Sequence, residues 1–139
     1  MGASYIALEC AGFLKALGID VTVMVRSIFL RGFDQQLANK VGEHMENMGV
    51  KFLKKAVPTS ITKNSAGKKV VTFKQGDDEA EDTFDTVMFA IGRSADTKGL
   101  DLDKVGVKTA KNGKILAKDD DTTDGKDIYA IGDVAEGRL

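Results

Sequence analysis

Small residues open the chain at a spacing that lets a backbone approach a phosphate group closely. Gly2, Ser4 and Ala7 occupy the positions of a G-x-G-x-x-G/A fingerprint. In that fingerprint the first glycine allows a tight turn, and the third small residue keeps a helix close to a sheet. Serine at the second position is small enough for the approach, and its hydroxyl can donate a hydrogen bond. The match is weak, and a plain helix N-terminus with Ser4 as its N-cap is the alternative.

Two arginines follow the first predicted strand, residues 20–25, where a dinucleotide-binding unit contacts the ribose. Units that bind NADH usually carry an Asp or Glu at this point, but this chain has Arg26, Ser27 and Arg31. A carboxylate repels a 2′-phosphate, whereas a guanidinium can bind one through two hydrogen bonds. The residue types therefore favour NADPH over NADH, and a solvated surface loop is the alternative.

Two further apolar runs end in residues that suit a nucleotide or its sugar. Residues 86–91 lead to Gly92-Arg93, and a run that starts at residue 127 ends at Gly132-Asp133. We expect both runs to form buried strands, so that a ligand at the carboxyl ends of the strands meets these residues. Glycine permits close approach, and the Asp133 carboxylate can accept from ribose or ribityl hydroxyls. A simple Gly-Asp turn is the alternative for the second pair.

Alternating helix and strand signals indicate an α/β fold with a Rossmann-like parallel sheet flanked by helices. The expected elements are a largely buried helix over 4–17, a strand over 20–25, a helix over 35–48 and a strand over 50–53. Gly18 is the expected stop of the first helix and Asp34 the cap of the second. The expected apolar stripe of the second helix is Leu37, Val41, Met45 and Met48.

The stretch from 57 to 82 changes character. It contains the turn signal Asn64-Ser65-Ala66-Gly67 and the β-rich run Val70-Val71-Thr72-Phe73. We expect an antiparallel hairpin inserted in the parallel sheet, with residues 77–79 in a solvated turn.

One carboxylate lies inside the first predicted helix. Glu9 falls two turns into a segment that we expect to be buried, and a buried carboxylate needs a partner. Tyr5 lies one turn earlier on the same face. A contact with a ligand and a buried hydrogen bond are both open interpretations.

The composition of the 139 residues excludes several functions. The net charge is −1, which argues against a nucleic-acid or membrane surface role. No apolar run reaches the length of a membrane span. Cys10 and His44 are the single cysteine and histidine, so the chain has no disulfide framework and no metal site. We assign no catalytic residue within the chain.

The strand that normally leads into the glycine turn would lie before Gly2, in the middle of the sheet. We therefore expect this chain to be a piece of a longer protein. A targeting signal could have been removed with the missing part.

Four stretches together resemble the FAD- and NADPH-dependent pyridine nucleotide-disulfide oxidoreductases: G-x-S-x-x-A, V-R-S-x-x-x-R, A-I-G-R and Y-A-I-G-D. The stretches G-A-S-Y-I-A-L-E-C-A-G-F-L and V-T-V-M-V-R-S-I-F-L-R-G-F-D-Q-Q are most similar to the animal-type, high-molecular-weight thioredoxin reductases. The thioredoxin glutathione reductases are near neighbours, and glutathione reductases match less well. The resemblance covers nearly the whole chain.

This resemblance implies cofactor-binding roles for the matching residues. The residues implied to bind the NADPH pyrophosphate are Gly2, Ala3, Ser4 and Ala7, and those implied to bind the 2′-phosphate are Arg26, Ser27 and Arg31. Tyr5 is implied to be an aromatic gate over the flavin, with Ile6 and Glu9 beside the nicotinamide. The implied border with the FAD domain is Ala90, Ile91, Gly92 and Arg93, and Asp133 is implied to bind the FAD ribityl chain.

The resemblance also implies a division into an NADPH-binding domain, residues 1–93, and a partial FAD-binding segment, residues 94–139. The parent enzyme would be a homodimeric, cytoplasmic thioredoxin-disulfide reductase of redox homeostasis, with a mitochondrial form as the alternative. It would pass electrons from NADPH to FAD, to a redox disulfide and to thioredoxin. The redox cysteines, the interface domain and the C-terminal tail of the family have no counterpart here. The alternatives are a stand-alone, non-catalytic NADPH-binding module, the corresponding part of a glutathione reductase, and a truncated product without a stable fold.

Overall fold

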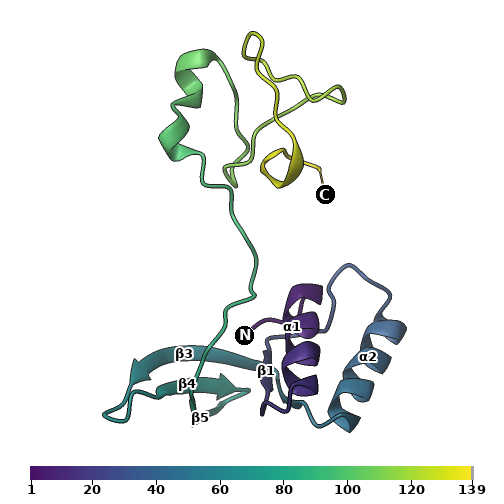
Figure 1. Cartoon of the computed structure of the whole chain (residues 1–139), viewed down its shortest axis with the longest axis vertical. Coiled ribbons are helices and arrows are strands. Elements are labelled where there is room, and N and C mark those ends of the chain that lie inside the picture. The colour runs from purple at the N-terminus through teal and green to yellow at the C-terminus, as the bar shows by residue number, and fades with distance from the viewer. Residues whose placement is uncertain (139) are drawn as a thin grey trace. The chain divides into compact units, whose positions relative to one another are not determined.

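The computed structural model describes residues 1–138. They form two compact units, Met1–Ile91 and Gly92–Leu139 (Figure 1). Within residues 1–138, the α-helices and extended strands lie in the first unit, and the second is built from short 3-10 turns and isolated bridges.

The first unit begins with a parallel α/β arrangement, as predicted. Helix α1 (Tyr5–Ala16) leads to strand β1 (Thr22–Val25), and helix α2 (Gln35–Asn47) leads to strand β2 (Lys51–Lys54). The two strands pair in parallel, with Thr22 opposite Lys51. Gly18 and Asp34 mark the helix ends as expected. Gly18 follows α1 with a φ of +83°. The Asp34 carboxylate caps α2 by accepting from the amide of Leu37 at 2.9 Å.

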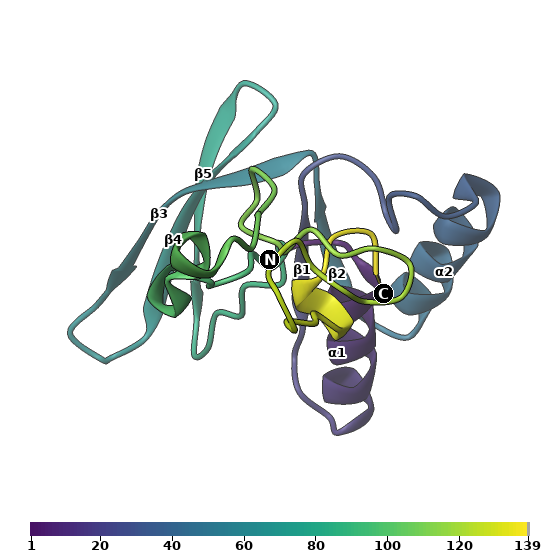
Figure 2. The same ribbon diagram turned by 90° about the horizontal axis from the view of Figure 1, so that it is seen from above.

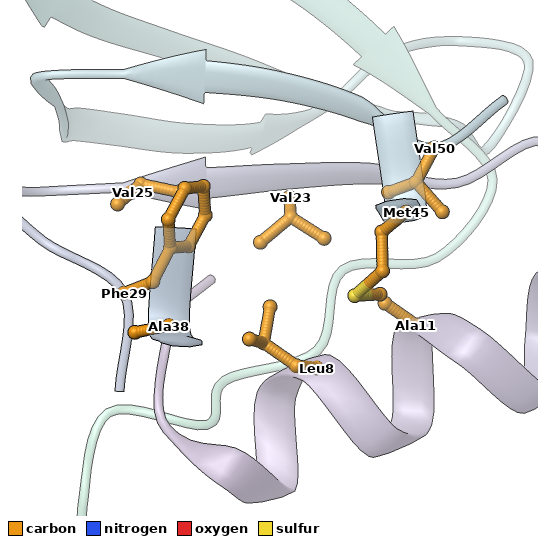
Figure 3. Close-up of a cluster of buried hydrophobic side chains, with 8 residues drawn as sticks. All are labelled: Leu8, Ala11, Val23, Val25, Phe29, Ala38, Met45 and Val50. Carbon is orange, nitrogen blue, oxygen red and sulfur yellow. The ribbon is translucent and has the colours of Figure 1, made fainter. Parts of the chain in front are cut away.

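A hydrophobic core fills the space between the two helices and the parallel strands. Leu8 and Ala11 of α1 meet Val23 of β1 and Met45 of α2 in this cluster (Figure 3). Figures 1 and 2 show both helices on the same side of the strands. This face of the sheet is therefore sealed by helices, as a parallel sheet requires.

An antiparallel sheet follows and covers the other side of the strands. Strands β3 (Ala56–Lys63), β4 (Lys69–Gln75) and β5 (Asp78–Phe84) pair in the order β3-β4-β5. A second core cluster joins Met24 of β1 to Ala56, Val71 and Phe73 of this sheet. The predicted turn at residues 64–67 is present, with the Gly67 amide bonded to the Asn64 carbonyl at 3.0 Å.

The antiparallel excursion is larger than the predicted hairpin. Residues from Asp78 onward form a third strand, and the turn lies at Gly76 and Asp77. The prediction of a solvated turn over 77–79 was therefore wrong for residues 78 and 79, which belong to β5. Most residues of this strand are charged and exposed. Charged residues have a low propensity for strands, so the sequence did not indicate one here.

The predicted apolar stripe of α2 was wrong in three of its members. Leu37 and Met48 are 65% and 59% exposed, and Val41 is also exposed. The buried face carries Ala38, Gly42 and Met45. Small residues face inward here because the ring of Phe29 lies against Gly42, where an added Cβ would come within 2.6 Å of the ring.

The apolar run over residues 86–91 is not a buried strand, which corrects the prediction. It contains no regular strand, and Phe89 and Ile91 are 58% and 73% exposed. Its backbone pairs with that of Met1, through the Ala90 amide and the Met88 carbonyl, and the Ala90 carbonyl also accepts from the Ser4 hydroxyl. A strand is buried on both faces only when neighbours cover it, and these residues have few.

The second unit has its own small core around Val107, Ile115, Ala130 and Ala135. Its 3-10 helices are Lys98–Leu100, Leu102–Val105 and Gly132–Val134. The predicted buried strand that begins at residue 127 is reduced to one bridge between Thr122 and Tyr129. Tyr129 and Ile131 are largely exposed, so Ala130 is the buried member of this run and the half-buried Ile128 packs against the same core.

Candidate functional site

The glycine turn forms at the carboxyl end of β1. Gly2 has a φ of +110°, and its amide donates to the Met24 carbonyl at 3.1 Å. Ser4 stands at the N-cap of α1, but its side chain does not cap the helix and instead donates to the Ala90 carbonyl at 3.5 Å. The first-turn amides of α1 thus have no side-chain cap and face the region where an anion binds to a helix N-terminus.

One backbone hydrogen bond ties this turn to the basic loop. The Leu30 amide donates to the Ala3 carbonyl at 2.8 Å. Leu30 has a positive φ of 44°, which bends the loop back toward the start of α1. The two predicted phosphate-binding segments, residues 2–7 and 26–31, are therefore neighbours in space.

The basic side chains of the loop are exposed. Arg31 donates from Nη2 to the Ser27 hydroxyl at 2.8 Å. Within residues 1–138, neither Arg26 nor Arg31 forms an ion pair with a carboxylate. Two guanidinium groups that lack internal acidic partners can bind an anionic ligand without first breaking an ion pair.

Gln35 is a positioning residue that the sequence analysis missed. Its side-chain amide reaches three carbonyl oxygens of the loop: those of Phe29 at 3.3 Å, Leu30 at 3.4 Å and Phe33 at 3.0 Å. A glutamine directly after the capping Asp34 is the signal that could have pointed to it. The residue anchors the basic loop to the first turn of α2.

Phe29 anchors the same loop from the core side. Its ring is buried and meets Phe52 edge-on, with centroids 5.0 Å apart. The loop therefore holds its two arginines outward while an aromatic side chain fixes its middle.

The exposed side of α1 carries the residues implied to lie beside the nicotinamide. Tyr5 is 54% exposed and Ile6 is 42% exposed, and Glu9 is exposed as well. The expectation of a largely buried helix was wrong, because only Ala7, Leu8 and Ala11 are buried. Glu9 consequently needs no internal partner.

The remaining predicted residues fall in different places. Ala90 and Ile91 belong to the first unit, where Ala90 contacts the glycine turn. Gly92, Arg93, Gly132 and Asp133 belong to the second unit. Gly132 and Asp133 begin a 3-10 turn, and both are exposed.

Within residues 1–138, no group of His, Cys, Asp and Glu side chains is arranged to hold a metal ion. The helices of this part of the chain are too short or too polar to cross a membrane.

A Rossmann-like α/β unit with a glycine turn and a basic loop defines a class of nucleotide-binding oxidoreductase domains. The sequence profile of the pyridine nucleotide-disulphide oxidoreductases matches residues 1–139. The chain belongs to this family, whose members generally use FAD and NAD(P)H. The predicted resemblance at the family level is confirmed.

A curated relative is thioredoxin reductase SEP1 of Emiliania huxleyi. It is 48% identical over 138 residues, which cover 99% of this chain. The chain spans 28% of the length of that relative. The closer resemblance to the animal-type enzymes stays a prediction.

Proposed function

We propose that the first unit is the NADPH-binding portion of a thioredoxin-disulfide reductase. The observation that carries this proposal is the pair of exposed arginines, which have no acidic partner within residues 1–138 and are held beside the start of α1 by the bond between Leu30 and Ala3. The relative named a thioredoxin reductase supports the choice of enzyme.

The residues fit the pyrophosphate and the 2′-phosphate of the nucleotide separately. The turn at Gly2 and the uncapped first-turn amides of α1 suit the pyrophosphate. Arg26, Arg31 and the Ser27 hydroxyl suit a 2′-phosphate, since guanidinium groups bind phosphate through paired hydrogen bonds. A carboxylate that would favour NADH is missing from residues 26–31.

NADPH, when bound, supplies a hydride for a flavin. The exposed Tyr5, Ile6 and Glu9 lie on the first turns of α1, next to the pyrophosphate turn. We assign them to the nicotinamide side of the ligand, with Tyr5 as the aromatic residue that moves aside. The chain provides the binding and orientation of the nucleotide, and electron transfer to a disulfide needs cysteines from elsewhere in the parent protein.

The second unit completes the proposal as part of an FAD-binding domain. Asp133 is exposed in the turn opened by Gly132, whose φ is +72°, and its carboxylate is suited to ribityl hydroxyls. The parent enzyme would use thioredoxin as its partner, act as a homodimer and work in the cytoplasm. A stand-alone NADPH-binding module is the second candidate, favoured by the self-contained core of the first unit.

The test is the affinity of the chain and three variants for NADPH. We expect Arg26→Ala and Arg31→Ala to weaken binding by about 10- to 100-fold each, because each removes a charge-assisted phosphate contact. Lys40→Ala is the matched control, since it removes an exposed cation from α2. Equal effects of all three variants would mean that only the overall charge attracts the nucleotide, and the clamp would be wrong.

A further inference from the structure

The hydroxyl group of Ser27 lies against a cation of its own loop. The Arg31 guanidinium donates from Nη2 to the Ser27 oxygen at 2.8 Å, and Arg26 directly precedes the serine in the sequence. All three residues are exposed. Neither arginine forms an ion pair with a carboxylate within residues 1–138. Ser27 is therefore a hydroxyl group placed beside two cations that can still accept an anionic partner.

The backbone of this loop is irregular but anchored. Residues 26–33 form no regular helix or strand. The Phe29 ring is buried in the core, the Leu30 amide donates to the Ala3 carbonyl at 2.8 Å, and the Gln35 side chain binds three loop carbonyl groups. The loop thus presents the Ser27 hydroxyl to solvent, where an enzyme that modifies surface loops can reach it.

A phosphate group on Ser27 would have the same partners as the 2′-phosphate of NADPH. It would carry about −1.5 to −2 charges at pH 7 and three acceptor oxygens, which form charge-assisted hydrogen bonds with neighbouring arginines. The existing bond keeps the Arg31 guanidinium within reach of such a group. Because the phosphate would be tethered to the loop, its effective concentration there would be on the order of millimolar or higher. A tethered phosphate can therefore compete with a nucleotide from solution.

We propose that Ser27 is a phosphorylation site, and that its phosphate occupies the basic loop in place of the 2′-phosphate of NADPH. This inference rests on the proposed function and adds a regulation of the same site. In the reaction, the Ser27 oxygen bonds to the γ-phosphorus of a nucleoside triphosphate, the bond from that phosphorus to the bridging oxygen breaks, and a nucleoside diphosphate leaves. The hydroxyl proton passes to an aspartate of the kinase. The two flanking arginines fit a kinase with an acidic substrate groove.

The first measurement follows phosphorylation of the folded chain by an arginine-directed protein kinase with MgATP. Mass spectrometry should find phosphate on Ser27. NADPH should slow this reaction more strongly than the same concentration of NADH, because exclusion between the two phosphates is reciprocal. A chain that stays unmodified at Ser27 would overturn the proposal, and so would equal protection by the two nucleotides.

The second measurement compares nucleotide affinities of the chain with and without phosphate on Ser27, introduced as phosphoserine during translation. We expect the phosphate to weaken NADPH binding at least about tenfold and NADH binding less, because two charge-assisted contacts are blocked. The control carries its phosphate on Ser65, an exposed residue of the turn between β3 and β4, and should bind both nucleotides as the unmodified chain does. Equal losses for NADPH and NADH would overturn the proposal, since charge repulsion alone would then account for them.

The third measurement needs no nucleotide. A phosphorus NMR titration of the chain phosphorylated at Ser27 should have its midpoint at least about half a pH unit below the ordinary value of about 6, and Arg31→Ala should reverse this. A midpoint that does not respond to Arg31→Ala would overturn the proposal even if NADPH binds as described above. Equal affinities of the unmodified chain for NADPH and NADH would instead show that the proposed function is wrong, and the competition with it, whatever the phosphorus signal does.

Discussion

The carbonyl group of Ala90 lies so close to Gly2 that a Cβ added to Gly2 would overlap its oxygen and come within 2.8 Å of its carbon. Gly2 also has a φ of +110°, a conformation that side chains disfavour. The two residues are far apart in the sequence, and their contact joins the glycine turn to the segment after β5. Glycine is required here by both the backbone angle and the available space.

Replacing this glycine should therefore destabilise the first unit. We expect Gly2→Ala to lower the free energy of unfolding by about 1–3 kcal/mol, because the strained φ and the overlap with Ala90 add. Urea unfolding provides the measurement. Gly12→Ala is the matched control, since its added Cβ in α1 meets no atom within 4 Å apart from its chain neighbours and the backbone of its own helix. That change should stabilise the helix by about 0.5–1 kcal/mol. Equal destabilisation by both would contradict the packing described for Gly2.

The anchor at Gln35 should act on nucleotide binding through the basic loop. We expect Gln35→Ala to weaken NADPH binding by about 2- to 10-fold, because the hydrogen bonds that orient the loop are lost. Exchange at the Leu30 amide should become faster in the same variant. NADH, which has no 2′-phosphate, should bind with nearly unchanged affinity.

Gln36→Ala serves as the comparison for Gln35, because Gln36 is the exposed neighbour on the same turn. It should leave both the loop exchange and the NADPH affinity unchanged. If Gln35→Ala alters NADPH and NADH affinities equally, Gln35 supports the fold in general and has no particular role at the 2′-phosphate.

The contact between Gly42 and Phe29 predicts a second effect on stability. Gly42→Ala would place a Cβ 2.6 Å from the Phe29 ring, which is packed between α2 and Phe52. We expect a loss of about 1–3 kcal/mol in the free energy of unfolding, because a well-packed core resists added volume. The double variant Gly42→Ala with Phe29→Leu should lose less than the sum of the single changes, since the smaller side chain makes room. Strict additivity would show that the two residues do not interact.

The second unit has a pH-dependent contact of its own. Lys108 donates to Asp124 at 2.7 Å, and this hydrogen bond and the charge of Lys108 hold the pKa of the Asp124 carboxyl below its usual 3.8. A depressed folded pKa means that the stabilisation is present above pH 3.8 and is lost as the pH falls through the folded value. We expect the unfolding midpoint of the chain to fall less steeply on acidification in Asp124→Asn. High salt should reduce the difference, because both groups are exposed. An identical acid response in the variant would exclude a contribution from this pair.

Local signals predicted the elements of the first unit well. The end of α1 before Gly18, the start of α2 after Asp34 and the basic loop after β1 lie where expected. They could be predicted because they depend on neighbouring backbone groups alone. The close approach of the glycine turn and the basic loop also followed from the pattern of the nucleotide-binding unit.

Features that depend on tertiary neighbours were predicted less well. The buried face of α2 is set by Phe29, which reaches Gly42 from a loop, and no periodicity within the helix reveals this. The apolar run at 86–91 is strand-like in sequence, but its regularity depends on a partner backbone that only Met1 provides. Gln35 was missed because its bonds go to backbone carbonyl groups, whose positions depend on the fold of the loop, and its place directly after Asp34 is a weak signal by itself.

The central claim is that the first unit binds NADPH through a 2′-phosphate clamp. The most direct measurement is a calorimetric titration of the chain with NADPH and, under the same conditions, with NADH. We expect NADPH to bind at least about tenfold more tightly, since the proposed site has two arginines and Ser27 to contact a phosphate that NADH lacks. Equal affinities, or tighter binding of NADH, would contradict it.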